Sequence, residues 1–157
     1  MKRINLICTL IIFFLIQVIS TNAQSLSSKD IVDVKAQISG KDVLVLQIEL
    51  KIKKGWHINS DQPFDEYLNP TKVTLKDSSL FANIQTEYPA PEIIKLDFSQ
   101  TDLSLYRDQV LIKVILTPKK ELINKELKID GSVSYQLCND QTCLFPTKKP
   151  FSVVFKQ

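Results

Sequence analysis

The chain has 157 residues, with 20 Lys and Arg against 17 Asp and Glu, and a formal net charge of +3. A charge so close to zero excludes the strongly basic footprint of a nucleic-acid-binding protein. One His, one Met and three Cys are too few soft or nitrogen ligands for a dedicated metal protein. We therefore expect no nucleic acid, no metal and no cofactor, and no motif points to a small-molecule substrate.

The first residues have the layout of a secretory signal peptide. Lys2 and Arg3 form a basic start, an apolar stretch covers about residues 6–16, and the predicted cut follows Ala23. The apolar run is shorter than the roughly 20 residues of a membrane-spanning helix, so we predict cleavage and export. Removal would leave one domain over residues 24–157 with a net charge of +1 and two cysteines. Two cysteines can pair in an oxidising compartment.

The exported part is patterned for strands. Residues 42–54 alternate apolar and polar side chains, which is typical of a half-buried strand. Residues 30–39 would pair with them across a turn that begins at Gly40. Further strands are predicted at residues 71–76, 83–88, 93–98, 109–118, 126–137 and 150–156.

The spacing of these strands predicts the fold class. Turn and breaker residues recur about every ten positions, and no segment has a helical period with caps. Seven to nine short strands at this spacing indicate an all-β protein, an immunoglobulin-like antiparallel β-sandwich. Residues 56–70 lack a strand pattern, and a loop of that length in a compact domain is usually functional or packed on something specific.

Cys138 and Cys143 stand near the end of the chain in the segment SYQLCNDQTCLFP, with four residues between them. Five residue steps along an extended strand would cover roughly 16 Å, whereas a disulfide needs Cα atoms about 4.4–6.8 Å apart. If the pair closes, the four residues must therefore turn back. Asn139 and Asp140 favour such a turn, because their side chains bond the local backbone. The simplest geometry is a β-hairpin with the cysteines at its neck.

Three roles compete for this pair. A disulfide that closes about six residues would stabilise the fold by only roughly 2 kcal/mol, against more than about 4 kcal/mol for a loop near 100 residues, so a purely structural staple is weak. Two sulfurs supply at most half of a zinc site. A thioredoxin-type centre needs two residues between its cysteines and a helix N-terminus. The residues favour a dithiol that exchanges with an activated partner more readily than it attacks unaided.

The segment YQLCNDQTCLFP resembles the active-site segment of a known family, the N-terminal periplasmic domains of the thiol:disulfide interchange protein DsbD. Residues 55–75, which begin GWHIN, resemble an earlier landmark of that family, and residues 103–114 resemble a later one. The landmarks occur in the right order over nearly the whole exported chain. The resemblance implies an immunoglobulin-like sandwich with a reversible disulfide between Cys138 and Cys143.

The resemblance also implies roles and partners. Cys143 would be the nucleophile that forms mixed disulfides, and Cys138 would resolve them. A cap loop with Phe98 as a shield and Asp97 as a possible proton partner would cover the pair. The partners would be thioredoxin-fold proteins of the periplasm, such as disulfide isomerases or cytochrome c maturation proteins. The chain would then be one component of a protein-disulfide reductase.

The chain also departs from the family pattern. Some members have five residues between the cysteines, and this chain ends at Gln157 without a membrane module or a thioredoxin-like domain. We therefore expect a separate membrane electron donor. The alternative is a non-catalytic binding module that keeps the sandwich and has an inert structural disulfide.

Three further residues are candidates for lining the site. Trp56 and His57 could line the approach to the cysteines, and the alternative is a Trp packed in the core beside a surface His. Tyr135 belongs to the same segment as the cysteines and is the third candidate.

Overall fold

The computed structural model describes residues 28–95, 101–120 and 126–156 and is nearly all antiparallel β-structure, which confirms the predicted immunoglobulin-like β-sandwich. The predicted signal peptide lies outside these residues. The strands are β1 (Val32–Gly40), β2 (Leu44–Ile52), β3 (His57–Asn59), β4 (Lys72–Leu75), β5 (Phe81–Glu87), β6 (Glu92–Ile94), β7 (Leu103–Arg107), β8 (Gln109–Pro118), β9 (Leu127–Tyr135), β10 (Leu137–Cys138) and β11 (Thr147–Phe155). One helical turn, α2 (Ser28–Ile31), precedes β1, and a short 3₁₀ turn, η2 (Ser78–Leu80), precedes β5.

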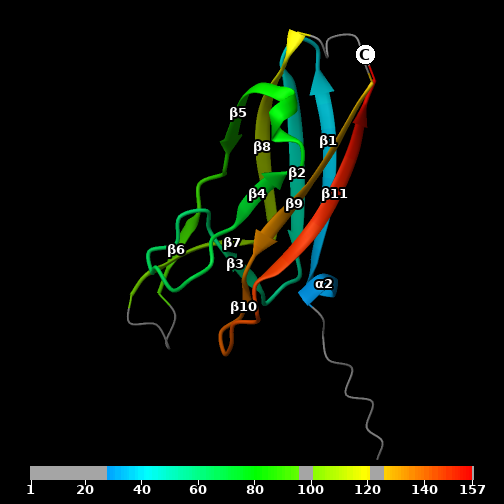
Figure 1. The fold of residues 1–157 in the computed structure, drawn as a ribbon. Helices are drawn as coiled ribbons and strands as arrows, with labels where there is room; N and C mark the ends of the chain where they lie inside the picture. Colours follow the sequence, from blue (N-terminus) through cyan, green and yellow to red (C-terminus); the bar gives the residue numbers. More distant parts are fainter. Residues whose placement is uncertain (1–27, 96–100, 121–125, 157) are drawn as a thin grey trace, which may run out of the picture.

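The strands form three sheets. One has the order β1-β2-β8-β5, a second has the order β11-β9-β4, and the third has the order β10-β3-β7-β6. Figure 1 shows the first two sheets facing each other and the third sheet at one end of the molecule. The four strands of this third sheet are short, and we call it the small sheet. The cysteine hairpin belongs to the small sheet, because β10 contains Cys138.

The hairpin of β1 and β2 forms as the alternating pattern predicts. Every second side chain of β2, from Leu44 to Ile52, is buried. Gly40 ends β1 with a φ of 123°, a conformation that only glycine adopts readily. A Cβ at Gly40 would lie 2.2 Å from the backbone oxygen of Val43, so the turn requires a glycine at this position.

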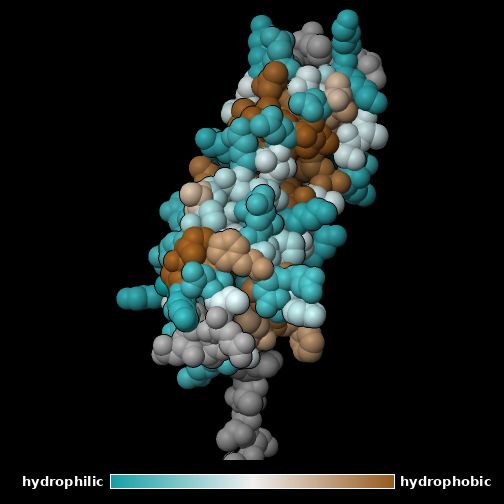
Figure 2. Space-filling model, turned by 90° about the vertical axis from the view of Figure 1, so that its left-hand side faces the viewer, coloured by the Kyte–Doolittle hydropathy of each residue, from teal (hydrophilic) through white to brown (hydrophobic). Residues whose placement is uncertain are grey.

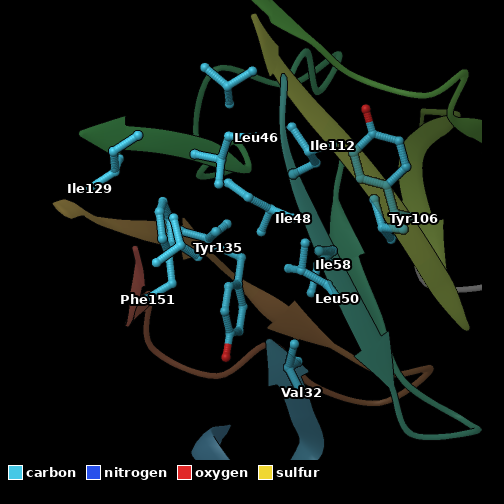
Figure 3. Close-up of a cluster of buried hydrophobic side chains, with 14 of the residues drawn as sticks. Val32, Leu46, Ile48, Leu50, Ile58, Tyr106, Ile112, Ile129, Tyr135 and Phe151 are labelled. Carbon is cyan, nitrogen blue, oxygen red and sulfur yellow. The ribbon is translucent and has the colours of Figure 1, made fainter. Parts of the chain in front are cut away.

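The core lies between the two larger sheets. Leu46 and Ile48 of β2 and Ile112 of β8 contribute side chains from one sheet, and Ile129 of β9 and Phe151 of β11 contribute from the other (Figure 3). The first three are fully buried, with exposed fractions of 0%. Burial of such side chains is worth roughly 1.5–3 kcal/mol each, so this packing is the main source of the sandwich's stability.

Several strands of the larger sheets bend into the small sheet. Gly55, with a φ of 83°, lies between β2 and β3, and Asp108, with a φ of 54°, lies between β7 and β8. A positive φ changes the direction of an extended chain. The backbone oxygen of Asp108 accepts a hydrogen bond of 2.7 Å from the N–H of Ile52, which ties the two bends together and fixes the small sheet to the sandwich.

The observed strands exceed the predicted seven to nine, because the short strands of the small sheet have no readable period. β3 begins at His57, inside the stretch 56–70 that lacks a strand pattern in the sequence. The strand predicted at residues 93–98 is seen as β6 over Glu92–Ile94, and residues 96–98 lie outside the described part of the chain. The predicted strand 126–137 is interrupted at Gln136, so that it forms β9 and β10.

The side of the molecule that carries β5 and β6 has hydrophobic side chains in two areas, with hydrophilic side chains between them (Figure 2). A groove of about 480 Å³ runs beside β6, and Phe64 and Ile93 are among the residues that line it. Both side chains are exposed, at 61% and 51%.

In the described part of the chain, no helix is long and apolar enough to cross a membrane.

Candidate functional site

A tight hairpin brings Cys138 and Cys143 together. They form a disulfide with a Cα–Cα distance of 4.0 Å. The N–H of Asn139 donates to the backbone oxygen of Thr142 at 2.9 Å. The Asn139 side-chain oxygen accepts hydrogen bonds from the N–H groups of Gln141 at 2.9 Å and Thr142 at 2.8 Å. Asn139 therefore closes the turn as an Asx motif, with the cysteines at its neck.

The two sulfur-bearing residues differ sharply in exposure. Cys138 is 1% exposed, whereas Cys143 is exposed. Thiol–disulfide exchange requires an incoming sulfur to reach the sulfur that it attacks. In the described part of the chain, Cys143 is therefore the cysteine that solvent can reach and the better candidate for contact with a partner.

His57 is the cross-strand neighbour of Cys138. In the small sheet, His57 of β3 lies opposite Cys138 of β10 on one side and opposite Arg107 of β7 on the other. Cys143 pairs with Cys138 in an isolated bridge. Four residues therefore form one row across the sheet, in the order Cys143, Cys138, His57 and Arg107. Directly opposite residues of antiparallel strands project to the same face.

The imidazole of His57 is buried and uncharged at neutral pH. His57 is 3% exposed, so it is not the surface histidine that we considered as an alternative. Burial lowers the pKa of His57 below its ordinary value of 6.5, and the positive charge of Arg107 lowers it further, although Asp140 acts in the opposite direction. Because this pKa lies below 7, the neutral form predominates at neutral pH.

A polar network anchors the base of the hairpin. The side-chain oxygen of Gln136 accepts hydrogen bonds from the Asn59 side chain at 3.3 Å and from the Asn69 backbone N–H at 3.2 Å. The Gln136 amide donates to the backbone oxygen of Leu144 at 3.3 Å. These bonds join β3, the 56–70 stretch and both arms of the hairpin. Gln136 and Asn59 could not be recognised from the sequence, except that both lie close to the predicted landmarks.

The other predicted site residues lie in different surroundings. Trp56 is partly buried and packs against the main core. Tyr135 is 1% exposed and belongs to that core (Figure 3). Among the described residues, its hydroxyl is the buried side-chain oxygen without a hydrogen-bond partner, and burial raises its pKa to about 12. The structure thus brings His57 to the cysteines, and it places Tyr135 in the core.

Two predicted cap residues, Asp97 and Phe98, lie outside the described part of the chain. Within the described ranges, no three His, Cys, Asp or Glu side chains are grouped in a way that would hold a metal ion. The row that contains the disulfide supplies two sulfurs, an imidazole that can accept or release a proton, and a guanidinium that carries a fixed positive charge.

Exposed aromatic side chains occur at the same end of the molecule. Phe145 is 92% exposed, and it follows Cys143 by two residues. Tyr67, in the stretch that the Gln136 network ties to the hairpin, is 84% exposed. Aromatic residues are enriched in protein interfaces, so the surroundings of Cys143 suit contact with another protein.

An immunoglobulin-like sandwich with a hairpin disulfide that is open at one sulfur has the parts of a thiol–disulfide interchange domain. Residues 22–154 match the family model described as "Thiol:disulfide interchange protein DsbD, N-terminal". The chain therefore belongs to this family. Comparison with curated protein sequences gives no match.

Solved structures that share the fold include two N-terminal periplasmic or DsbD domains. The N-terminal periplasmic domain of ScsB from Proteus mirabilis superposes with a TM-score of 0.62 at 14% identity, over 82% of this chain and 48% of that one. This chain thus spans about half the length of the ScsB domain. The DsbD N-terminal domain of Neisseria meningitidis, in its reduced form, superposes with a TM-score of 0.52 at 12% identity, over 79% and 86% of the two chains. At these identities the likeness shows the fold alone.

Proposed function

We propose that this chain is a periplasmic relay domain that passes reducing equivalents through a reversible Cys138–Cys143 disulfide to thioredoxin-fold proteins. The observation that carries the proposal is the exposure of Cys143 beside a buried Cys138. Membership of the DsbD N-terminal family supports the same chemistry. The recipients would be disulfide isomerases or cytochrome c maturation proteins, and a membrane electron donor would supply the electrons.

The exchange proceeds in two steps. The Cys143 thiolate attacks a disulfide of the partner, which forms a mixed disulfide and releases one partner sulfur as a thiolate. Cys138 then attacks Cys143, so that the Cys138–Cys143 bond forms and the second partner sulfur leaves. The domain is oxidised and the partner disulfide is reduced to a dithiol. Phe98 and Asp97 would shield the pair and assist its proton transfer, as the family resemblance implies.

Trapping of the mixed disulfide tests this proposal. A Cys138→Ala variant keeps the exposed sulfur but lacks the resolving one, so we expect covalent adducts with thioredoxin-fold proteins to accumulate in the native periplasm. A reductant should release these adducts, and mass spectrometry of the linked peptides should place the bond at Cys143. The matched control is Cys143→Ala, which keeps the buried cysteine and should give no adduct.

The same experiment separates the relay from the alternative, a non-catalytic binding module with a structural disulfide. Such a module would bind its partner without a covalent bond, and it would keep that binding when both cysteines are replaced by Ala. Absence of any thioredoxin-fold adduct in Cys138→Ala, together with partner binding by the double variant, would contradict the relay and favour the module.

A further inference from the structure

The row Cys143, Cys138, His57, Arg107 places the only histidine of the chain beside the buried sulfur. Opposed residues in antiparallel strands have Cβ atoms about 4.5–5.5 Å apart. An imidazole on Cβ of His57 and a sulfur on Cβ of Cys138 are therefore within reach of each other. The observed register of β10 and β3 already places the two residues opposite each other.

This neighbourhood is separate from the main core. Ile58, Tyr106 and Leu137 alternate with His57, Arg107 and Cys138 along their strands, and all three belong to the main core cluster. Alternate residues of a strand project to opposite faces, so His57 and Cys138 point away from the main core. They are nonetheless buried, at 3% and 1% exposure. The imidazole and the sulfur share a shielded site that the packing of the sandwich does not use.

Resolution of the mixed disulfide requires the Cys138 thiol to lose its proton. A thiol attacks a disulfide only as its thiolate, and a buried thiol has less access to water as a proton acceptor. Burial and Arg107 keep His57 in its neutral form at neutral pH, so its nitrogen has a free lone pair.

We propose that His57 accepts the proton of the Cys138 thiol when Cys138 resolves a mixed disulfide at Cys143. The S–H bond of Cys138 breaks and its proton moves to the imidazole. The Cys138 sulfur then bonds to Cys143, and the sulfur formerly bound to Cys143 leaves with the electron pair. The imidazolium returns its proton to that leaving thiolate or to water. This inference rests on the proposed exchange, because it assigns a role within it.

A small aromatic disulfide isolates the step from any partner protein. The full chain carrying Cys8→Ser, which removes the third cysteine, is reduced and mixed with an equimolar amount of dithiobis(nitrobenzoate) in a stopped-flow absorbance experiment. The first thionitrobenzoate is released when Cys143 attacks the reagent, and the second is released when Cys138 resolves the adduct. The two phases therefore report the two cysteines separately.

His57→Gln should leave the first phase unchanged and slow the second by about 100-fold at pH 7, the lower end of what a general base contributes. In the parent protein the second phase should lose rate as the pH falls through the pKa of His57, because imidazolium cannot accept a proton. In His57→Gln this limb should be absent, and the rate should instead rise steadily with pH, because hydroxide or water must then remove the proton of the thiol.

Two charge variants test the same step while His57 itself stays in place. Arg107 lowers the pKa of His57 and Asp140 raises it, so Arg107→Gln should move the midpoint of the acid limb to higher pH and Asp140→Asn to lower pH. Superimposable second phases for the parent protein and His57→Gln, or a midpoint that neither charge variant moves, would overturn the proposal. Since no partner protein takes part, failure of partner trapping and failure of this test are separate outcomes.

Discussion

In the reduced protein, iodoacetamide is expected to modify Cys143 at least about 100-fold faster than Cys138. The reason is the difference in exposure, because Cys143 is exposed and Cys138 is 1% exposed. A buried thiol reacts only when its surroundings open, and an opening that costs about 3 kcal/mol suppresses the rate by roughly two orders of magnitude. Cys138 lies in β10, which pairs with β3, so opening would break this pairing.

The measurement uses two single-cysteine variants, Cys138→Ala and Cys143→Ala, each with Cys8→Ser, and follows alkylation by mass spectrometry. The control is the same pair of variants in concentrated urea, where the two cysteines should react at similar rates because no structure protects either. Equal rates in the native proteins would contradict the assignment of Cys143 as the sulfur that meets a partner.

Replacement of Gly131 by Val is expected to lower the free energy of unfolding by about 3 kcal/mol or more, the upper end of the cost of overpacking. Gly131 lies in β9 between Phe151 of β11 and Leu75 of β4. A Cβ at this position would lie 2.4 Å from the Phe151 ring and 2.8 Å from the backbone oxygen of Thr74. The ring is buried in the core, and the Thr74 oxygen belongs to the backbone of β4, which pairs with β9. Relief of the clash would therefore disturb core packing or strand pairing.

A loss of stability in Gly131→Val would identify the steric clash as its cause. Strand propensity favours Val over Gly, and removal of a glycine ordinarily stabilises a protein through the unfolded chain, so a loss can come only from the clash. Ser134→Val is the matched control, because Ser134 lies on the same strand and is only partly buried, and it should change stability by less than about 0.5 kcal/mol. Urea unfolding measures both variants. Equal stability of Gly131→Val and the parent protein would show that the strand does not pack as described.

The long strands could be predicted from the sequence because their burial alternates with the pleat. Leu44 to Ile52 of β2 show one buried face and one face that is partly buried or exposed, and the turn at Gly40 needs its glycine. The hairpin at Cys138 was predictable too, since Asn139 supplies the turn chemistry within four residues. In each case the decisive interactions are local in sequence.

The small sheet could not be predicted for the opposite reason. β3 and β10 have three and two residues, too few for a period to be read. The pairing of His57 with Cys138 and Arg107 arises from register between distant segments, so the sequence left open whether His57 was at the site or on the surface. The roles of Asp97 and Phe98 depend on family resemblance and stay predictions.

The reduction potential of the Cys138–Cys143 pair tests the central claim most directly. The protein is equilibrated in dithiothreitol or glutathione redox buffers, and the reduced fraction is counted by thiol alkylation and mass spectrometry. A relay disulfide should have a potential above about −300 mV, in the range where thioredoxin-fold proteins exchange electrons. A potential below about −300 mV, as for structural disulfides of exported proteins, would contradict the relay and leave the pair as a staple.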